Sequence, residues 1–222
     1  MNPFGTTVVI VCDGQFPKTE YPRYLMQTAG FTICCDGALI KYIRNSKAIF
    51  GEERRPDLVI GDMDTLPATL QKRHADIIVK ETEQVHNDQT KAVRWAINNI
   101  TDISTIHIIG ATGGRADHTI GNISLLMEYT RMFNLGEITL EMVCDEGIIF
   151  PITDSIEIVC GAGRKISIFS PDNTLNIKSE GLEYKTDDVI FDNWWKATLN
   201  KAAEDMIRLT FSHRSLALIM MN

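Results

Sequence analysis

Short apolar runs and longer amphipathic stretches alternate between residues 7 and 133. The short runs are rich in Val, Ile and Thr, and they predict strands over residues 7–12, 31–35, 58–60, 76–79 and 105–109. The stretches between them place apolar residues at helical spacing and predict helices over residues 22–29, 38–47, 67–74, 88–98 and 117–133. Strands separated by helices are typical of an α/β fold, in which a mainly parallel sheet has helices on both faces.

The pattern changes after residue 136, where short extended pieces follow one another without an amphipathic helix between them. Gly, Pro, Asn and Asp separate these pieces, which predict strands over residues 138–144, 156–160, 165–169, 175–177, 188–191, 206–211 and 216–221. Such a series predicts an antiparallel all-β sandwich or barrel. We therefore expect an α/β domain over residues 1–143 and an all-β domain over residues 144–222.

Glycine and aspartate gather where the predicted parallel strands end. Asp13-Gly14 and Asp36-Gly37 follow two strands, Gly61-Asp62 follows a third, and a glycine-rich stretch (residues 110–118) follows a fourth. Ligands of open α/β sheets bind beyond the carboxyl ends of the strands. Each Asp-Gly pair is either a nucleotide contact or a simple turn; we favour the contact for Asp36 and Gly37.

The glycine-rich stretch reads Gly-Ala-Thr-Gly-Gly-Arg-Ala-Asp-His and lies between a predicted strand and a predicted helix. Glycines allow backbone N–H groups to approach an anion, and the helix N-terminus attracts negative charge. An arginine adds a forked phosphate donor, while the aspartate either caps the helix or holds a metal. The stretch lacks the Gly-Lys-Ser/Thr of a Walker A loop. The stretch is therefore a candidate phosphate site, in which His118 either contacts a phosphate or nucleobase or merely caps the helix.

Asp62 and Asp64 are two residues apart at a predicted strand end, so in an extended backbone both carboxylates point the same way. Carboxylate oxygens that converge near phosphates are suitable ligands for Mg²⁺. The alternative is a polar turn before the next helix, with Thr65 as its cap.

Asp88 and Lys91 are three residues apart at a predicted helix start, which places them on one helical face. Asp88 is a candidate third metal carboxylate, and Lys91 a candidate phosphate contact. The alternative, favoured for this pair alone, is an N-cap and a solvated lysine.

Composition limits the classes of function. The 222 residues carry a formal net charge of −7, which argues against a nucleic-acid-binding protein or a protein that binds anionic membranes. No apolar run approaches the roughly 20 residues of a membrane span, and the N-terminus does not resemble a signal peptide. Five cysteines without paired spacing favour reduced thiols. We expect a cytoplasmic protein.

Three aromatic residues of the predicted all-β domain, Tyr184, Trp194 and Trp195, are candidate stacking surfaces for a ligand ring. Core packing is the favoured alternative, since aromatic side chains bury large areas.

These motifs together resemble the thiamine pyrophosphokinase family. Its Asp-Gly-Ala strand end is matched by residues 36–38, and its Pro-Asp-x-x-x-Gly-Asp-Phe-Asp-Ser element by residues 56–65. Its glycine-rich stretch is present at residues 110–118, with Asn122 beyond.

The resemblance implies transfer of pyrophosphate from ATP to the hydroxyl of thiamine, with Mg²⁺ bound and AMP released. It implies that Asp62, Asp64 and Asp88 hold Mg²⁺ and the phosphates. The ATP contacts that it implies are Lys91, Thr112, Gly113, Gly114, Arg115, Asp117 and His118. It also implies a homodimer with active sites between subunits. The substrate contacts that it implies are Gln84, Tyr184 and Asn200.

The chain departs from the family pattern before the helix predicted at residues 88–98 and in the predicted all-β domain. In the family's Asp-Gln-x-x-Thr-Asp element, Glu83 replaces Asp and Asn87 replaces Thr. Tyr184 stands where a stacking Trp is expected, and Leu199 replaces the serine of a Ser-Asn pair. The alternatives are a kinase or pyrophosphokinase for another small alcohol, and a non-catalytic sensor of nucleotide or thiamine.

Overall fold

The computed structural model describes residues 5–222 and divides into two compact units. The first, here the α/β unit, comprises the described residues up to Leu125 together with Phe133–Asp145. The second, here the β unit, comprises Leu126–Met132 and Glu146–Asn222.

The α/β unit contains six parallel strands in the order β6-β5-β1-β2-β3-β4. The central strands have almost no solvent-exposed side chains, which explains their mostly apolar runs: a parallel sheet with both faces covered has no polar face. The strands are β1 (Thr6–Val11), β2 (Phe31–Cys35), β3 (Leu58–Gly61), β4 (Ile78–Lys80), β5 (Ile103–Ile109) and β6 (Thr139–Cys144).

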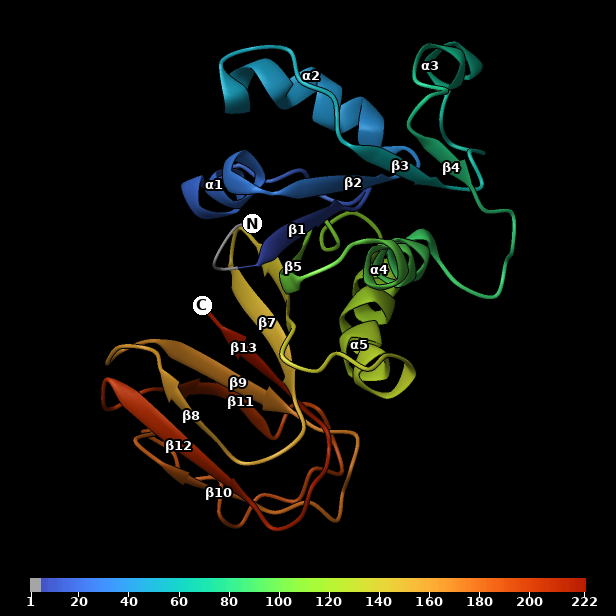
Figure 1. The fold of residues 1–222 in the computed structure, drawn as a ribbon. Coiled ribbons are helices and arrows are strands. Elements are labelled where there is room, and N and C mark those ends of the chain that lie inside the picture. Colours follow the sequence, from blue (N-terminus) through green and yellow to red (C-terminus); the bar gives the residue numbers. More distant parts are fainter. Residues whose placement is uncertain (1–4) are drawn as a thin grey trace. The chain divides into compact units, whose positions relative to one another are not determined.

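Helices lie on both faces of this sheet, with α1 and α2 on one side and α4 on the other (Figure 1). Parallel strands are joined by right-handed crossovers, so the helices change face where the strand order reverses. That reversal lies between β1 and β5. Strands β2, β3 and β4 are added on one side of β1, whereas β6 is added on the opposite side, next to β5. The helices are α1 (Glu20–Thr28), α2 (Ala38–Phe50), α3 (Ala68–Arg73), α4 (Asp88–Asn99) and α5 (Ala116–Met132).

The β unit contains seven antiparallel strands, four in the order β11-β9-β13-β7 and three in the order β10-β12-β8. They are β7 (Gly147–Ile152), β8 (Ile156–Val159), β9 (Lys165–Phe169), β10 (Ile177–Glu180), β11 (Ala197–Lys201), β12 (Met206–Phe211) and β13 (Ala217–Met221).

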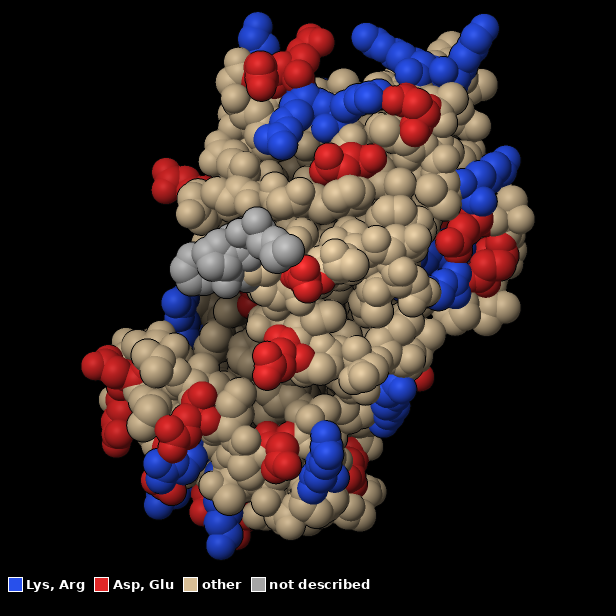
Figure 2. All heavy atoms as spheres, viewed as in Figure 1, with Lys and Arg blue, Asp and Glu red and all other residues tan. Residues whose placement is uncertain are grey.

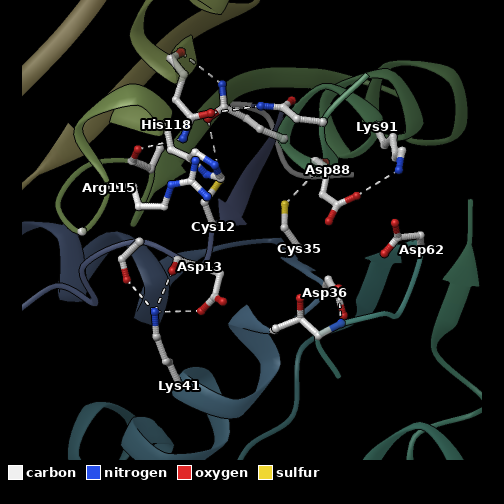
Figure 3. Close-up of a pocket in the computed structure, with 18 of the residues that line it drawn as sticks. Cys12, Asp13, Cys35, Asp36, Lys41, Asp62, Asp88, Lys91, Arg115 and His118 are labelled. Carbon is white, nitrogen blue, oxygen red and sulfur yellow. Dashed lines mark hydrogen bonds and ion pairs between the residues drawn. The ribbon is translucent and has the colours of Figure 1, made fainter. Parts of the chain in front are cut away.

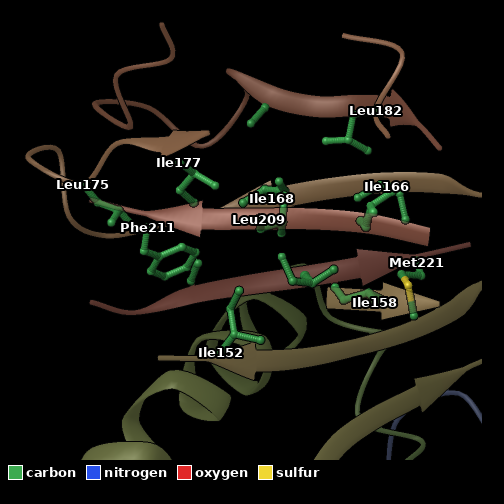
Figure 4. Close-up of a cluster of buried hydrophobic side chains, with 14 of the residues drawn as sticks. Ile152, Ile158, Ile166, Ile168, Leu175, Ile177, Leu182, Leu209, Phe211 and Met221 are labelled. Atoms are coloured by element: carbon green, nitrogen blue, oxygen red, sulfur yellow. The ribbon is translucent and has the colours of Figure 1, made fainter. Parts of the chain in front are cut away.

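Alternate residues of these strands point into one apolar core (Figure 4). In β12, Ile207, Leu209 and Phe211 are buried while the residues between them are exposed, the period of two expected of a half-buried strand. The core also holds Ile166 and Ile168 of β9, both fully buried. The predicted fold class, a parallel α/β sheet followed by an antiparallel β region, is confirmed.

Several predicted strands are wrong in detail. The strand at residues 138–144 pairs in parallel with β5 instead of opening the antiparallel region. Strands β7 and β11 were missed, because Pro151 interrupts the β pattern of the first and a bulge interrupts the pairing of the second. Residues 188–191 form no strand: residues 187 and 188 lie in a turn, closed by a hydrogen bond from Val189 N–H to the Thr186 carbonyl (2.9 Å). The strand predicted at 175–177 begins at Ile177.

On the face shown in Figure 2, acidic and basic side chains are interspersed. Among the described residues, no helix is both long enough and apolar enough to span a bilayer.

Candidate active site

A cavity of about 730 Å³ opens at the carboxyl ends of the parallel strands, around the reversal of strand order. Its wall includes Cys12 and Cys35, which follow or end β1 and β2, and residues from the glycine-rich stretch and the start of α4 (Figure 3). Residues that are distant in sequence therefore line one cavity of the α/β unit, because they follow neighbouring strands of its sheet.

Three carboxylates converge in this cavity. Asp36, Asp62 and Asp64 each offer one oxygen, and these oxygens lie within 4.8 Å of one another. The two carboxylates after β3 are brought together by a turn, in which Met63 has φ +65°, instead of by the extended backbone expected. The Thr65 hydroxyl donates to Asp64 (2.9 Å), so Thr65 is not the helix cap that the alternative supposed.

Asp36 is the most buried of the three, with 4% of its surface exposed. Its Oδ2 accepts from Thr65 N–H (3.1 Å), whereas its buried Oδ1 has no hydrogen-bond partner within the described part of the chain. Burial raises the pKa of Asp36, and the neighbouring Asp88 and Asp64 carboxylates raise it further. A cation at this place would satisfy the bare oxygen and offset the burial of its charge.

Asp62 has the opposite electrostatic environment. The Gln84 side-chain amide donates to it (3.0 Å) and Asp64 N–H donates to it (3.1 Å). These two hydrogen bonds lower the pKa of Asp62. Gln84, expected to contact substrate, thus holds a carboxylate of the cluster in its ionised form.

Asp88 begins α4 and forms an ion pair with Lys91 (3.0 Å). Burial raises the pKa of Asp88, and the hydrogen bond from Lys91 opposes that rise. Lys91 is only 2% exposed and also donates to the Glu81 carbonyl (3.1 Å). The sequence favoured Asp88 as an N-cap and Lys91 as a solvated lysine, and both expectations are wrong. Lys91 is buried, and the N-cap of α4 is Asn87.

The two departures in the segment before α4 have clear structural roles. Asn87 accepts from Thr90 N–H (3.0 Å), so it supplies the N-cap that a threonine would also supply. Glu83 accepts from the N–H groups of Val85 (2.9 Å) and His86 (3.2 Å), which fixes the loop that carries Gln84.

In the glycine-rich stretch, Gly113 and Gly114 have φ of +74° and +78°, a region that favours glycine. Arg115 and Asp117, both exposed, bind each other through Nε–Oδ1 (3.1 Å) and Nη2–Oδ2 (2.5 Å) contacts. The Arg115 hydrogen bond lowers the pKa of Asp117 to about 2. Asp117 lies on a neighbouring hollow that it shares with His118.

The cavity collects most of the expected α/β-unit residues. Its wall omits Thr112, whose carbonyl instead accepts from Gln15 N–H (2.7 Å). Sequence reasoning missed Lys41, which lines the cavity from the second turn of α2. The expected residues that line the cavity are Asp36, Gly37, Asp62, Asp64, Gln84, Asp88, Lys91, Gly113, Gly114, Arg115 and His118.

The two expected residues of the β unit lie beside each other. Asn200 is buried, and its side chain accepts from Tyr184 N–H (3.1 Å) and donates to the Tyr184 carbonyl (2.6 Å). Its amide therefore positions Tyr184, whose ring is exposed. The core alternative is wrong for all three aromatic residues: Tyr184, Trp194 and Trp195 are 63%, 40% and 67% exposed. Leu199 is also exposed, with φ +59° at the bulge of β11.

Residues 22–136 match the family described as thiamin pyrophosphokinase, catalytic domain, and residues 147–217 match the thiamin pyrophosphokinase substrate-binding domain. The chain belongs to the thiamin pyrophosphokinase family. Thiamine pyrophosphokinase 1 of rice is 24% identical over 168 residues, covering 68% of this chain and 61% of the relative. Matches to the first three curated thiamine pyrophosphokinases span between 43% and 61% of their lengths.

Solved thiamine pyrophosphokinases share the fold. The Candida albicans protein superposes with a TM-score of 0.79 at 16% identity, covering 99% of this chain and 90% of its own. The Bacillus subtilis protein gives a TM-score of 0.75 at 19% identity, covering 97% and 98% respectively.

Proposed function

We propose that this chain is a thiamine pyrophosphokinase, which transfers pyrophosphate from ATP to the hydroxyl of thiamine and releases AMP. Membership of the family supports the proposal. The observation that carries it is the cluster of Asp36, Asp62 and Asp64, with one buried oxygen bare, in the same cavity as the glycine-rich stretch. Phosphate transfer requires this combination of anion-binding backbone and metal-binding carboxylates.

Mg²⁺ fits the residues present. The cluster offers only hard carboxylate oxygens, and the bare Asp36 oxygen lacks the partner that a buried acceptor requires. Asp62 and Asp64 would hold the ion together with Asp88, as the family resemblance implies, and we propose Asp36 as a further ligand because its carboxylate lies near theirs. When bound, Mg²⁺ supplies positive charge that neutralises the phosphates.

The chain's own residues would position ATP and stabilise charge. The N–H groups at Thr112, Gly113 and Gly114 and the guanidinium of Arg115 suit phosphate oxygens. Arg115 would exchange its partner Asp117 for a phosphate, and the buried Lys91 would hold Asp88 in place.

In the reaction, the thiamine hydroxyl oxygen bonds to the β-phosphorus while the bond from that phosphorus to the α,β-bridging oxygen breaks. AMP leaves with the bonding electron pair, and the hydroxyl proton passes to a base. Transfers of this kind depend on positioning and charge neutralisation more than on covalent chemistry by the protein.

For the acceptor, we propose that residues 144–222 bind thiamine while residues 1–143 bind ATP. The exposed ring of Tyr184, whose backbone is held by Asn200, offers a stacking surface for a cationic heterocycle. Gln84 remains a proposed substrate contact of the α/β unit. We propose a homodimer with active sites between subunits, which sedimentation velocity tests. The free thiols of Cys12, Cys34, Cys35 and Cys160 support a reducing, cytoplasmic setting.

The test is incubation of the purified protein with ATP, Mg²⁺ and thiamine, followed by chromatography of all products. We expect thiamine pyrophosphate and AMP in equal amounts, and neither with the Asp62→Asn variant. ADP in place of AMP would make the protein a kinase. ATP binding without any thiamine product would contradict the acceptor assignment and turn attention to Tyr184 and Leu199.

A further inference from the structure

A short turn after β1, residues 13–15 (the β1 turn), is hydrogen-bonded to the glycine-rich stretch. Gly14 N–H donates to the Gly110 carbonyl (2.7 Å), and Gln15 N–H donates to the Thr112 carbonyl (2.7 Å). Both carbonyls precede Gly113, where the backbone bends toward α5. The β1 turn therefore fixes the position of the backbone that leads into the proposed phosphate contacts.

The two segments also pack without space between them. A Cβ added to Gly14 would lie 2.6 Å from the Thr112 carbonyl oxygen and closer still to that of Gly110. A Cβ added to Gly113 would lie 2.5 Å from Gln15 Cβ. Backbone packed this closely cannot move independently, so a displaced β1 turn must displace the glycine-rich stretch.

Lys41, on α2, holds the β1 turn in place (Figure 3). Its ammonium donates to the carbonyls of Asp13 (2.6 Å) and Gly14 (2.8 Å) and forms an ion pair with the Asp13 carboxylate (2.7 Å). An ammonium has three N–H donors, and these three contacts account for all of them. Although Lys41 lines the cavity, its donors are directed to two backbone carbonyls and the side-chain carboxylate of the β1 turn.

We propose that Lys41 is a positioning residue for the phosphate site: it fixes the β1 turn, which in turn fixes the glycine-rich stretch for ATP. The inference rests on the proposed function for the identity of the nucleotide. It differs from a direct role of Lys41 on the phosphates, because the residue acts through residues 13–15.

Amide hydrogen exchange of the ligand-free protein and calorimetric titration with Mg²⁺-ATP test this on three variants. Lys41→Met removes the donors, Lys41→Arg retains them, and Lys47→Met removes a charge from an exposed position of the same helix. We expect Lys41→Met to speed exchange at Gly14 and Gln15 about tenfold and to raise the Kd for ATP about tenfold. In steady-state assays it should raise KM for ATP much more than it lowers kcat. Lys41→Arg should restore most of the protection, and Lys47→Met should match the wild type.

Weaker ATP binding with unchanged exchange at Gly14 and Gln15 would mean that Lys41 contacts the nucleotide itself, and would overturn the proposal. Faster exchange with unchanged ATP affinity would overturn it too, because the turn would then not matter to the site. Neither hydrogen exchange nor calorimetry needs thiamine, so these two measurements test the proposal even if thiamine is not the acceptor. If the wild type binds no ATP, the proposed function fails together with the proposal, while exchange still reports whether Lys41 holds the turn.

Discussion

At the level of single residues, Arg115 and Asp117 form a pair that ATP must separate if the guanidinium is to reach a phosphate. The hydrogen bond from Arg115 holds the pKa of Asp117 at about 2, below its ordinary value. We expect Arg115→Gln to raise that pKa toward about 4, the value of an unpaired aspartate. At a pH between about 2 and about 4, the Asp117 carboxylate should therefore be mostly ionised in the wild type and mostly protonated in the variant.

Carboxyl ¹³C chemical shifts followed from pH 1.5 to 7 measure this pKa directly. Arg131→Gln is the matched control, since Arg131 lies on the same helix and pairs with Glu128 instead. An Asp117 titration that is identical in wild type and Arg115→Gln would show that the pair does not form in solution.

The carboxylate cluster makes a second prediction about single residues. Asp62→Asn keeps the size of the side chain but removes a charged ligand, so affinity for a divalent cation should fall about tenfold or more. Electron paramagnetic resonance of Mn²⁺ titrated into the nucleotide-free protein measures this without any assay of activity. Asp76→Asn, which alters an exposed ion pair with Arg55, should leave Mn²⁺ affinity unchanged. Equal affinities for all three proteins would remove Asp62 from the metal site.

Among the elements, the start of α4 shows how a departure from the family pattern can preserve a function. Asn87 caps the helix through Thr90 N–H, and loss of such a cap costs about 1 kcal/mol. We expect Asn87→Ala to lower the free energy of unfolding by about this amount, whereas Asn87→Thr should lower it by only a few tenths because a hydroxyl also caps. Urea unfolding measures both. A loss that is equally large for threonine would contradict the capping role.

In the β unit, Asp172 ties together two loops that are distant in sequence. It accepts from the hydroxyls of Ser215 and Thr174 (both 2.6 Å) and contacts His213 Nε2 (3.1 Å). These bonds, that of Ser215 foremost, hold the pKa of Asp172 well below its ordinary value. Because the folded pKa lies below the unfolded value of about 4, the carboxylate stabilises the fold above that pH and the stabilisation is lost as pH falls.

Asp172→Asn should therefore lower the free energy of unfolding by about 1–2 kcal/mol at pH 7. The difference from the wild type should shrink as the pH drops below about 4, because the unfolded wild type takes up a proton there while the folded carboxylate stays ionised down to its own, lower pKa. Thermal unfolding at a series of pH values tests this. Asp188→Asn, at an exposed carboxylate of the same unit, is the control. A difference that persists unchanged at low pH would argue against an ionised Asp172 as its cause.

The sequence was sufficient to predict elements whose pattern is strong and local. The runs of β1, β2 and β5 are mostly apolar because helices cover both faces, and each is followed by a turn signal. Strand β11 could not be found in this way, because its pairing with β9 is interrupted between Ala197 and Asn200 and depends on the neighbouring strand. Pairing of that kind is a property of the assembled sheet and leaves no periodicity in the sequence.

At the scale of the whole molecule, the motifs predicted which residues lie together at the cavity but not the hydrogen bonds that each side chain forms there. Asp-Gly and Gly-Asp strand ends indicated the cavity, since parallel strands bring their carboxyl ends together. The bare Oδ1 of Asp36 and the full occupation of the Lys41 ammonium depend on contacts between β1, β2 and α2. Neither can be deduced from spacing along one segment. The same holds for Asn200, whose amide is committed to Tyr184.

If residues 1–143 bind ATP and residues 144–222 bind thiamine, a substitution in one domain should change KM for one substrate only. Tyr184 is exposed and its backbone is fixed by Asn200, so Tyr184→Ala should remove a stacking surface without disturbing the fold. We expect KM for thiamine to rise about tenfold, as for the loss of a cation–ring contact, with KM for ATP unchanged. Tyr184→Trp restores an aromatic face and should lower KM for thiamine to the wild-type value or below it.

Steady-state rates with each substrate varied in turn, together with circular dichroism of the variants, provide the measurement. Lys185→Ala is the matched control, since Lys185 neighbours Tyr184 and is likewise exposed. If Tyr184→Ala raised KM for ATP instead, residues 144–222 would take part in nucleotide binding. If it changed neither constant, the acceptor ring would not stack on Tyr184, and exposed Trp195 would become the surface to test.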